Sequence, residues 1–150
     1  MPRVISTSFV IAVHDLDKTT VFYRDVLGFE VEEVFDEGWR AYTFGSCRIM
    51  AGRCPEAIHP SKLGDHSYFA YVEIKEIDKY YEAVCTAGAK MGQAISQIGD
   101  TPWGMREFCV VTVDGHRIMF GSAMTDGDAL LGESGRCRVI AGRTAVRGGT

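Results

Sequence analysis

The sequence TPWGMREFCVVTVDGHRIMFG, residues 101–121, carries the clearest structural signal in this 150-residue chain. Residues 107–113 form an extended run of mostly apolar and β-branched side chains, and residues 116–120 form another. Asp114 and Gly115 stand between these runs, and an Asp-Gly pair in this position is a strong short-range signal of a β-hairpin turn. The stretch therefore predicts two paired antiparallel strands.

A shorter counterpart of this hairpin occurs in the first half of the chain, as WRAYTFGSCRIMAG at residues 39–52. Gly45 and Ser46 take the turn position, and the triplet at residues 48–50 (RIM) is repeated at residues 117–119. Upstream, residues 13–17 (VHDLD) match residues 74–78 (IKEID) at a constant spacing. Self-similarity of this kind indicates that one structural unit occurs twice.

Each repeat predicts the element order βαβββ. In the first repeat we expect a strand at residues 4–13, a helix at 16–27, a strand at 29–36 and the hairpin at 39–52. In the second repeat we expect a strand at residues 68–74, a helix at 76–87, a weaker strand at 91–98 and the opening hairpin. Asp15 is a good N-cap for the first helix, and Gly28 and Gly88 are expected to end the two helices.

These elements divide the chain into four parts. The predicted parts are a first module at residues 1–54, a linker at 55–65, a second module at 66–121 and a C-terminal extension at 122–150. The linker contains two prolines and a glycine and has no hydrophobic period. The extension contains no aromatic residue and no clear period, so we expect it to be peripheral.

The composition is that of a globular domain, with 46% hydrophobic and 24% charged residues. A net charge of −4 without a basic face argues against a nucleic-acid partner. No apolar run approaches membrane-spanning length, and the first residues lack the apolar core of a signal peptide, so we expect a cytoplasmic protein without a membrane partner. The five cysteines include no CxxC spacing, which favours buried free thiols over a disulfide framework or a zinc site.

Two motifs make the chain resemble the vicinal oxygen chelate superfamily, which includes glyoxalase I, fosfomycin resistance proteins, extradiol dioxygenases and bleomycin resistance proteins. The first is VHDLDK at residues 13–18, leading into FYRDVLGF at residues 22–29, and it is common throughout the superfamily. The second is PWGMREF at residues 102–108, leading into Asp114-Gly115, and it is similar to bleomycin-resistance-like members in particular. The resemblance covers residues 4–121 and departs from the family at Val113, where relatives usually have proline before the turn.

This resemblance implies an α+β fold in which two βαβββ modules form a curved eight-stranded mixed sheet around a cavity, with the helices on the outside and a homodimer as the usual assembly. Alternation along the first strand of each module then assigns two opposite faces. The helix-facing residues are expected to be Phe9, Ile11, Val13, Ala70, Val72 and Ile74. The cavity-facing residues are expected to be Ser8, Val10, Ala12, Phe69, Tyr71 and Glu73.

The resemblance also implies where a metal would be bound. Metal-using relatives supply His, Gln or Glu from the first and last strand of each module, and the equivalent positions here are Ser8, Met50, Phe69 and Met119. None of these is a good ligand for a hard or borderline divalent ion, and the four histidines are scattered along the sequence. We therefore expect no metal and no cofactor. The two methionines either line a soft pocket or fill core space.

Aromatic side chains at the predicted cavity are candidates for ligand binding. Trp39 and Trp103 stand at equivalent hairpins, where each could stack on a flat ligand or pack in the core. Phe69 and Tyr71 point inward by strand parity. Glu73 lies on the same face, where a carboxylate needs solvent, a cationic ligand or an arginine.

Three arginines complete the candidate set. Arg48 and Arg117 are repeat-equivalent, and they and Arg106 could hold an anionic group or pair with Glu73 and Glu107, alternatives that the sequence leaves open. No nucleophile with an evident base is present, so we expect no catalytic residue. The predicted ligand-binding residues are Ser8, Trp39, Arg48, Met50, Phe69, Tyr71, Glu73, Trp103, Arg106, Arg117 and Met119.

The functional hypothesis with most support is a metal-free, dimeric protein that binds a small molecule. Its resemblance to bleomycin resistance proteins suggests sequestration of a bulky aromatic or cationic antibiotic, as in antibiotic resistance, without any chemistry on the ligand. A metal-dependent glyoxalase-like lyase, isomerase or dioxygenase is the alternative. A sensor or accessory domain is a third hypothesis, which the lack of a DNA-binding segment disfavours.

Overall fold

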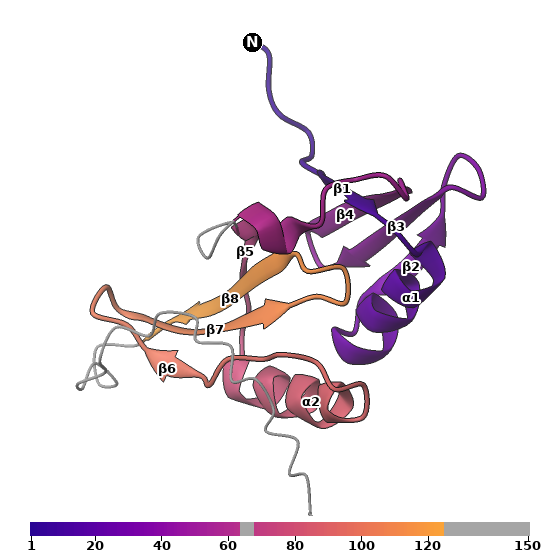
Figure 1. Cartoon of the computed structure of the whole chain (residues 1–150). Helices are drawn as coiled ribbons and strands as arrows, with labels where there is room; N and C mark the ends of the chain where they lie inside the picture. The colour runs from indigo at the N-terminus through magenta and orange to yellow at the C-terminus, as the bar shows by residue number, and fades with distance from the viewer. Residues whose placement is uncertain (64–67, 125–150) are drawn as a thin grey trace, which may run out of the picture.

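The computed structural model describes residues 1–63 and 68–124, and the described part contains two modules with the same element order (Figure 1). The strands of the first module are β1 (Phe9–Val13), β2 (Glu30–Glu33), β3 (Trp39–Phe44) and β4 (Cys47–Arg53). Its helical segment consists of α1 (Leu16–Val21) and a π-helical turn (Phe22–Val26). A 3₁₀ turn (Pro60–Leu63) lies in the predicted linker. The remainder of that linker, residues 64–65, lies outside the described residues.

The second module repeats this arrangement. Its strands are β5 (Tyr68–Glu73), β6 (Gly99–Asp100), β7 (Met105–Val111) and β8 (Arg117–Ala123), and its helix is α2 (Ile77–Ala89). Residues 66–67 and most of the predicted extension, residues 125–150, lie outside the described residues. The α+β fold of two βαβββ modules is thus confirmed.

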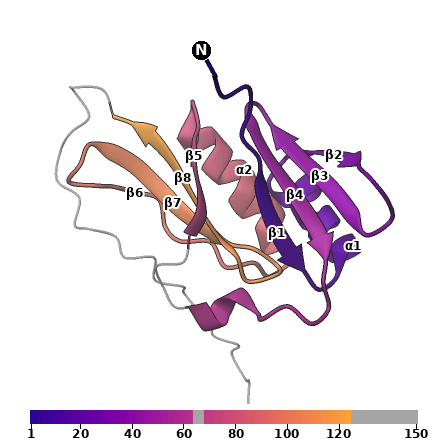
Figure 2. The ribbon, with the colours of Figure 1, turned by 90° about the horizontal axis from the view of Figure 1, so that it is seen from above.

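The eight strands belong to two four-stranded mixed sheets, ordered β1-β4-β3-β2 and β5-β8-β7-β6. In each sheet the first strand of the module is parallel to the last, and the other neighbours are antiparallel. Val10 pairs with Met50 in the first sheet, and Tyr71 pairs with Met119 in the second. Residues at equivalent positions of the sequence repeat therefore pair in the same way in the two sheets. Figure 2 shows β1 and β5, the edge strands of the two sheets, close to one another in the middle of the molecule.

One face of each sheet is buried against the helices, and the other is open. Along β1 and β5 the buried residues alternate with exposed ones, as expected for strands with one face in a core. The buried set contains Ile11, Val13, Ala70 and Val72, joined by Ile74 just after β5. Val10 and Tyr71 lie on the open faces and are 64% and 48% exposed. The predicted strand parity is therefore correct.

A single hydrophobic core joins the two modules. The Tyr80 hydroxyl of α2 donates a hydrogen bond of 2.7 Å to the carbonyl oxygen of Leu27 in the first module. The Thr19 hydroxyl of α1 donates to a carboxylate oxygen of Asp114, in the β7–β8 turn, at 2.7 Å, and both residues are buried. Because these contacts cross the module boundary, the helices join the two sheets.

Several predicted boundaries differ from the observed ones. The first strand begins at Phe9, and the predicted helix at 16–27 changes to π-helical geometry from Phe22. Asp15 does cap α1, accepting a hydrogen bond from the Lys18 backbone N–H. The predicted stop at Gly88 is wrong, because α2 continues to Ala89. The weak strand predicted at 91–98 is also misplaced, since only an isolated bridge at Ile95 precedes the short β6.

β8 continues to Ala123, which includes two residues that the sequence predicted to lie in the extension. Among the residues that the structure describes, no helix is both long and apolar enough to cross a bilayer.

Candidate functional site

The open face of the second sheet carries a cluster of side chains that strand register brings together. Tyr71 on β5 pairs with Met119 on β8, and Met119 pairs with Cys109 on β7, so all three lie on one face. Glu107 lies two residues before Cys109, on the same face, and pairs with Gly121. Three adjacent strands therefore contribute to one surface.

Glu107 is the polar centre of this cluster. Its Oε1 atom accepts a hydrogen bond of 2.8 Å from the Tyr71 hydroxyl and one of 3.0 Å from the indole Nε1–H of Trp103. Partial burial and the hydrogen bond to Glu107 raise the pKa of the Tyr71 phenol, so that it remains a neutral donor at physiological pH. Two aromatic donors thus fix the orientation of one carboxylate.

Local backbone features place both aromatic rings. Trp103 precedes Gly104, whose φ of +84° is a left-handed conformation that glycine adopts without strain, in the turn before β7. Tyr71 lies over Gly121, where an added Cβ would stand 1.9 Å from the phenol oxygen. Only glycine at position 121 leaves this position free for the phenol.

These side chains line a cavity of about 390 Å³. Its walls are Tyr68, Phe69, Ala70, Tyr71, Trp103, Glu107 and Met119. Four of the predicted ligand-binding residues therefore meet at one site: Phe69, Tyr71, Trp103 and Met119. The wall is mainly aromatic and apolar with one carboxylate, which is the usual character of a small-molecule site.

The open face of the first sheet holds a second group of predicted residues. The indole ring of Trp39 covers Gly52, where an added Cβ would meet the ring at 2.8 Å, and the exposed Phe35 contacts that indole edge-on. Arg48 on β4 forms an ion pair of 3.4 Å with Glu32 on β2. Met50 is half-buried on this face. Gly52 and Gly121 occupy equivalent positions, each with an aromatic ring above it.

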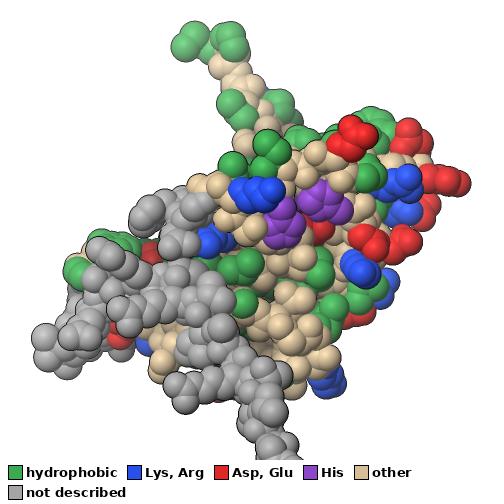
Figure 3. Space-filling model, viewed as in Figure 1, with side chains coloured by type: hydrophobic (Ala, Val, Ile, Leu, Met, Phe, Trp, Pro, Cys, Tyr) green, Lys and Arg blue, Asp and Glu red, His purple; other side chains and the backbone are tan. Residues whose placement is uncertain are grey.

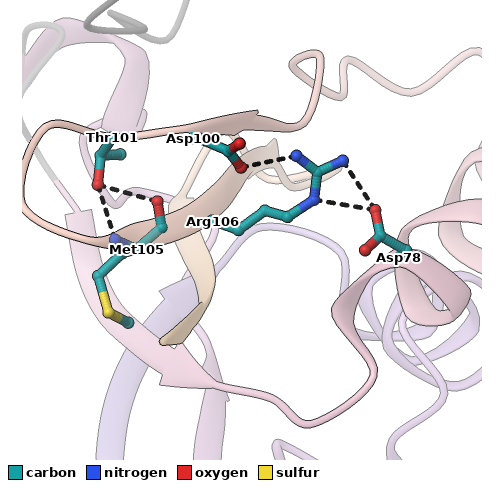
Figure 4. A network of polar contacts seen from close by, with 5 residues as sticks. All are labelled: Asp78, Asp100, Thr101, Met105 and Arg106. Atoms are coloured by element: carbon teal, nitrogen blue, oxygen red, sulfur yellow. Dashed lines mark hydrogen bonds and ion pairs between the residues drawn. The ribbon is translucent and has the colours of Figure 1, made fainter. Parts of the chain in front are cut away.

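Arg106 does not line the cavity around Glu107, and Figure 4 shows its guanidinium between Asp100 and Asp78. Its guanidinium bonds Asp100 at 2.7 Å and Asp78, at the start of α2, at 2.9 and 3.0 Å. The two carboxylates raise the pKa of the guanidinium. Because strand side chains alternate, Arg106 projects to the face opposite Glu107. Asp78 and Asp100 are therefore the partners of Arg106, and Glu73 is not.

The remaining predicted residues lie near the edges of the open faces. Ser8 is half-buried and immediately precedes β1. Glu73 is exposed at the end of β5 and pairs in register with Gly121. Arg117 begins β8, opposite Tyr68. None of these three lines the cavity around Glu107.

The donor set at the implied metal positions does not fit a divalent ion. Met119 and Phe69 line the cavity and offer a thioether and a phenyl ring, while Met50 lies in the other sheet and Ser8 immediately precedes β1 of that sheet. Within residues 1–63 and 68–124, no three His, Cys, Asp or Glu side chains form a group that could hold a metal ion.

The histidines are not scattered in space as they are in the sequence. The rings of His14 and His59 stack with centroids 5.9 Å apart, and Figure 3 shows histidine side chains gathered on one surface. His116 lies near them, and burial together with the proximity of His59 and His14 lowers its pKa to about 4. Its Nδ1 atom is buried without a hydrogen-bond partner among the described residues. His66 lies outside those residues. This cluster lies at the module junction.

Burial of the cysteines is only partly as expected. Cys109 is buried and Cys47 and Cys85 are half-buried, but Cys54 is exposed, and all four are free thiols. Cys137 lies outside the described residues.

Sequence reasoning missed the central residue of the cavity. Glu107 was considered only as a partner for arginine, although alternation from Met119 through its neighbour on β7 would have placed it on the cavity face. The role of Gly121 was also missed, because the need for a glycine arises from Tyr71, which is fifty residues away in the sequence.

Comparison with known proteins identifies the family. The model of the glyoxalase/bleomycin resistance protein/dioxygenase superfamily matches residues 6–120. No curated protein matches the chain.

Solved structures share the fold at low sequence identity. A bleomycin-binding protein from bleomycin-producing Streptomyces verticillus, complexed with copper(II)-bleomycin, is 24% identical with a TM-score of 0.63, and the match covers 83% of this chain and 100% of that one. A glyoxalase-related enzyme from Clostridium phytofermentans is 22% identical with a TM-score of 0.66, covering 82% and 98%. TioX from Micromonospora sp. ML1 is 20% identical with a TM-score of 0.58, covering 79% and 96%.

Proposed function

Because the chain belongs to the glyoxalase/bleomycin resistance protein/dioxygenase superfamily, we propose that it is a metal-free protein that binds and sequesters a bulky aromatic or cationic small molecule of the bleomycin type. The observation that carries this proposal is the cavity in which Tyr71 and Trp103 both donate to Glu107. Sequestration needs no chemistry on the ligand. It needs a shaped, oriented surface, which these contacts supply.

The exposure of the two aromatic rings supports a binding role. Trp103 is 64% exposed and Tyr71 is 48% exposed, although burying such rings would be favourable. Each ring is nevertheless held in one orientation by its hydrogen bond to Glu107, so little side-chain entropy remains to be lost when a ligand stacks on it. Both rings are therefore arranged for contact with a flat partner.

We further propose a homodimer in the cytoplasm. The open faces of both sheets expose apolar groups, including Val10 and Tyr71, which a second copy could cover or complete into grooves. The free thiols of Cys47, Cys54, Cys85 and Cys109 are typical of a reducing compartment. Sedimentation analysis of the purified protein tests the assembly, and a monomer at micromolar concentration would refute it.

Tryptophan fluorescence tests the binding function, because the chain contains only two tryptophans. The Trp39→Phe variant retains Trp103 as its single reporter, and the Trp103→Phe variant retains Trp39. On titration with bleomycin, we expect saturable quenching or a spectral shift from Trp103. No response from either variant up to high micromolar bleomycin would contradict this ligand class. A response that requires stoichiometric zinc, nickel, manganese or iron on the protein would instead favour the metal-dependent enzyme.

A further inference from the structure

We propose that Glu107 makes the cavity of the second sheet selective for planar cations that carry N–H donors. This inference rests on the proposed binding function and specifies the chemical class that the cavity takes.

The hydrogen-bonding pattern leaves one oxygen of Glu107 available. Both aromatic donors bind Oε1, the Tyr71 hydroxyl at 2.8 Å and the Trp103 indole at 3.0 Å. An ionised carboxylate has about four acceptor positions on its two oxygens. Among the described residues Glu107 accepts no other hydrogen bond, so Oε2 can receive one or two N–H groups from a ligand. The two existing bonds hold the carboxylate plane fixed while it does so.

The charge of Glu107 is not balanced by a neighbouring cation in the described part of the chain. Of the three predicted arginines, Arg48 pairs with Glu32 on the other sheet, and Arg106 pairs with Asp78 and Asp100 on the opposite face. Arg117 lies at the start of β8, opposite Tyr68, and does not line the cavity around Glu107. Among residues 1–63 and 68–124, the half-buried carboxylate therefore lies beside aromatic rings without an ion-pair partner. A cationic ligand would supply that partner, whereas an anionic ligand would be repelled.

The aromatic walls favour a planar shape for this cation. The exposed rings of Tyr71 and Trp103 flank Glu107, and the negative faces of such rings attract a positive charge spread over a flat group. Phe69 and Met119 supply the apolar remainder of the lining. A protonated heteroaromatic amine or an amidinium on an aromatic ring can donate N–H groups to the carboxylate, stack on the aromatic rings and contact the apolar wall at the same time.

Calorimetric titration with three ring systems of similar size tests the inference. The probes are 9-aminoacridine, which is a cation with N–H donors at neutral pH, acridine, which is neutral at pH 8, and anthracene-9-carboxylate, which is an anion. We expect the wild-type protein to bind 9-aminoacridine about tenfold or more tightly than acridine, which corresponds to one charge-assisted hydrogen bond. The anion should bind most weakly.

The decisive variant is Glu107→Gln, with Glu73→Gln as its matched control. Both substitutions remove one negative charge from the same sheet face, but Glu73 lies outside the cavity lining. Glu107→Gln should weaken 9-aminoacridine binding about tenfold or more and change acridine binding by less than about threefold. Glu73→Gln should change neither by more than about threefold. Tyr71→Phe keeps the carboxylate and removes one of its two hydrogen-bond donors, so it should weaken 9-aminoacridine binding less than Glu107→Gln does.

Three results would overturn the inference. They are equal binding of 9-aminoacridine by the wild type and Glu107→Gln, binding of acridine as tight as that of 9-aminoacridine, and failure of the wild type to bind any of the three probes. Each leaves the proposed function standing if bleomycin still changes the fluorescence of Trp103. Loss of that response alone would contradict the proposed function. Thermal unfolding of each variant confirms that it is folded before its titration is interpreted.

Discussion

Single residues determine the shape of the cavity, and Gly121 is the clearest case. Replacing it with alanine would put a Cβ 1.9 Å from the phenol oxygen of Tyr71. The phenol is the end of a rotatable side chain, so we expect it to swing away from Glu107 while the fold is retained. Gly121→Ala should therefore weaken ligand binding and leave the melting temperature nearly unchanged.

A matched control exists in the same sheet. Gly99 on β6 has no heavy atom within 4 Å of an added Cβ, and its backbone does not have a positive φ. Gly99→Ala should change neither binding nor melting, as measured by calorimetric titration and thermal unfolding. If Gly121→Ala binds the ligand as the wild type does, the Tyr71–Glu107 contact does not shape the site.

The lowered pKa of His116, at the module junction, predicts that the stability of the protein depends on pH. Its pKa is about 4 in the folded protein, below the usual value of 6.5, because burial and two nearby histidines disfavour its charged form. Above pH 6.5 the ring is neutral in both the folded and the unfolded protein, so its titration does not change the free energy of unfolding. As the pH falls from 6.5 towards 4, the unfolded chain gains a proton that the folded protein does not, so the free energy of unfolding decreases.

Urea unfolding of the wild type and His116→Phe at pH 7 and pH 5 measures this effect. Phenylalanine keeps a ring next to Phe69 and removes the titrating group, so the variant should lose less stability on acidification than the wild type. Burial raises the pKa of nearby Asp114, whose protonation favours the folded state at low pH and acts in the opposite direction. Comparing the two proteins separates His116 from Asp114. Equal losses in both proteins would refute the role of His116.

The sequence predicts residue positions well where alternation alone decides them. Strand parity predicts Phe69 and Tyr71 on the cavity face, the family resemblance implies Met119 there, and the structure brings all three together with Trp103. It cannot predict which polar groups meet, because pairing depends on register between distant strands. For that reason the contacts of Glu107 and Arg106 became clear only in the folded protein.

At the scale of elements, Arg106 joins β7, β6 and the first turn of α2 (Figure 4). Removing its charge should lower the free energy of unfolding by about 1 kcal/mol, since two partly exposed ion pairs are lost. Because Arg106 lies opposite the cavity, Arg106→Gln should not change ligand affinity. Arg48→Gln is the control for stability, because Arg48 forms one ion pair, with Glu32, at 3.4 Å, whereas Arg106 forms two shorter ones.

Chemical denaturation and calorimetric titration of the two arginine variants give both results. A loss of ligand affinity in Arg106→Gln, without a loss of stability, would mean that Arg106 contacts the ligand after all.

Element types were predictable, but some boundaries were not. The strand–helix–hairpin order of each module followed from local patterns and from the repeat. The π-helical turn at residues 22–26 and the shift of β6 to Gly99–Asp100 did not. Both depend on tertiary contacts. Tyr23 stacks on Tyr42 of β3 with ring centroids 4.5 Å apart, and β6 pairs with the first residues of β7. Local propensity cannot anticipate such partners.

At the scale of the whole molecule, the two modules share one element order but have different open faces. The first sheet presents Trp39 with an arginine–glutamate pair, whereas the second presents Tyr71 and Trp103 around the carboxylate of Glu107. The buried Thr19–Asp114 hydrogen bond and a common hydrophobic core join the two modules. The family fold is thus kept, while the side chains on the two open faces differ.

Calorimetric titration of chelator-treated protein with bleomycin, combined with elemental analysis of the complex, tests this account most directly. We predict saturable binding with no stoichiometric protein-bound zinc, nickel, manganese or iron, and a large loss of affinity when Tyr71 and Trp103 are both replaced by alanine. Binding that appears only after one of these metals is restored, or binding that is unaffected by the double substitution, would contradict it.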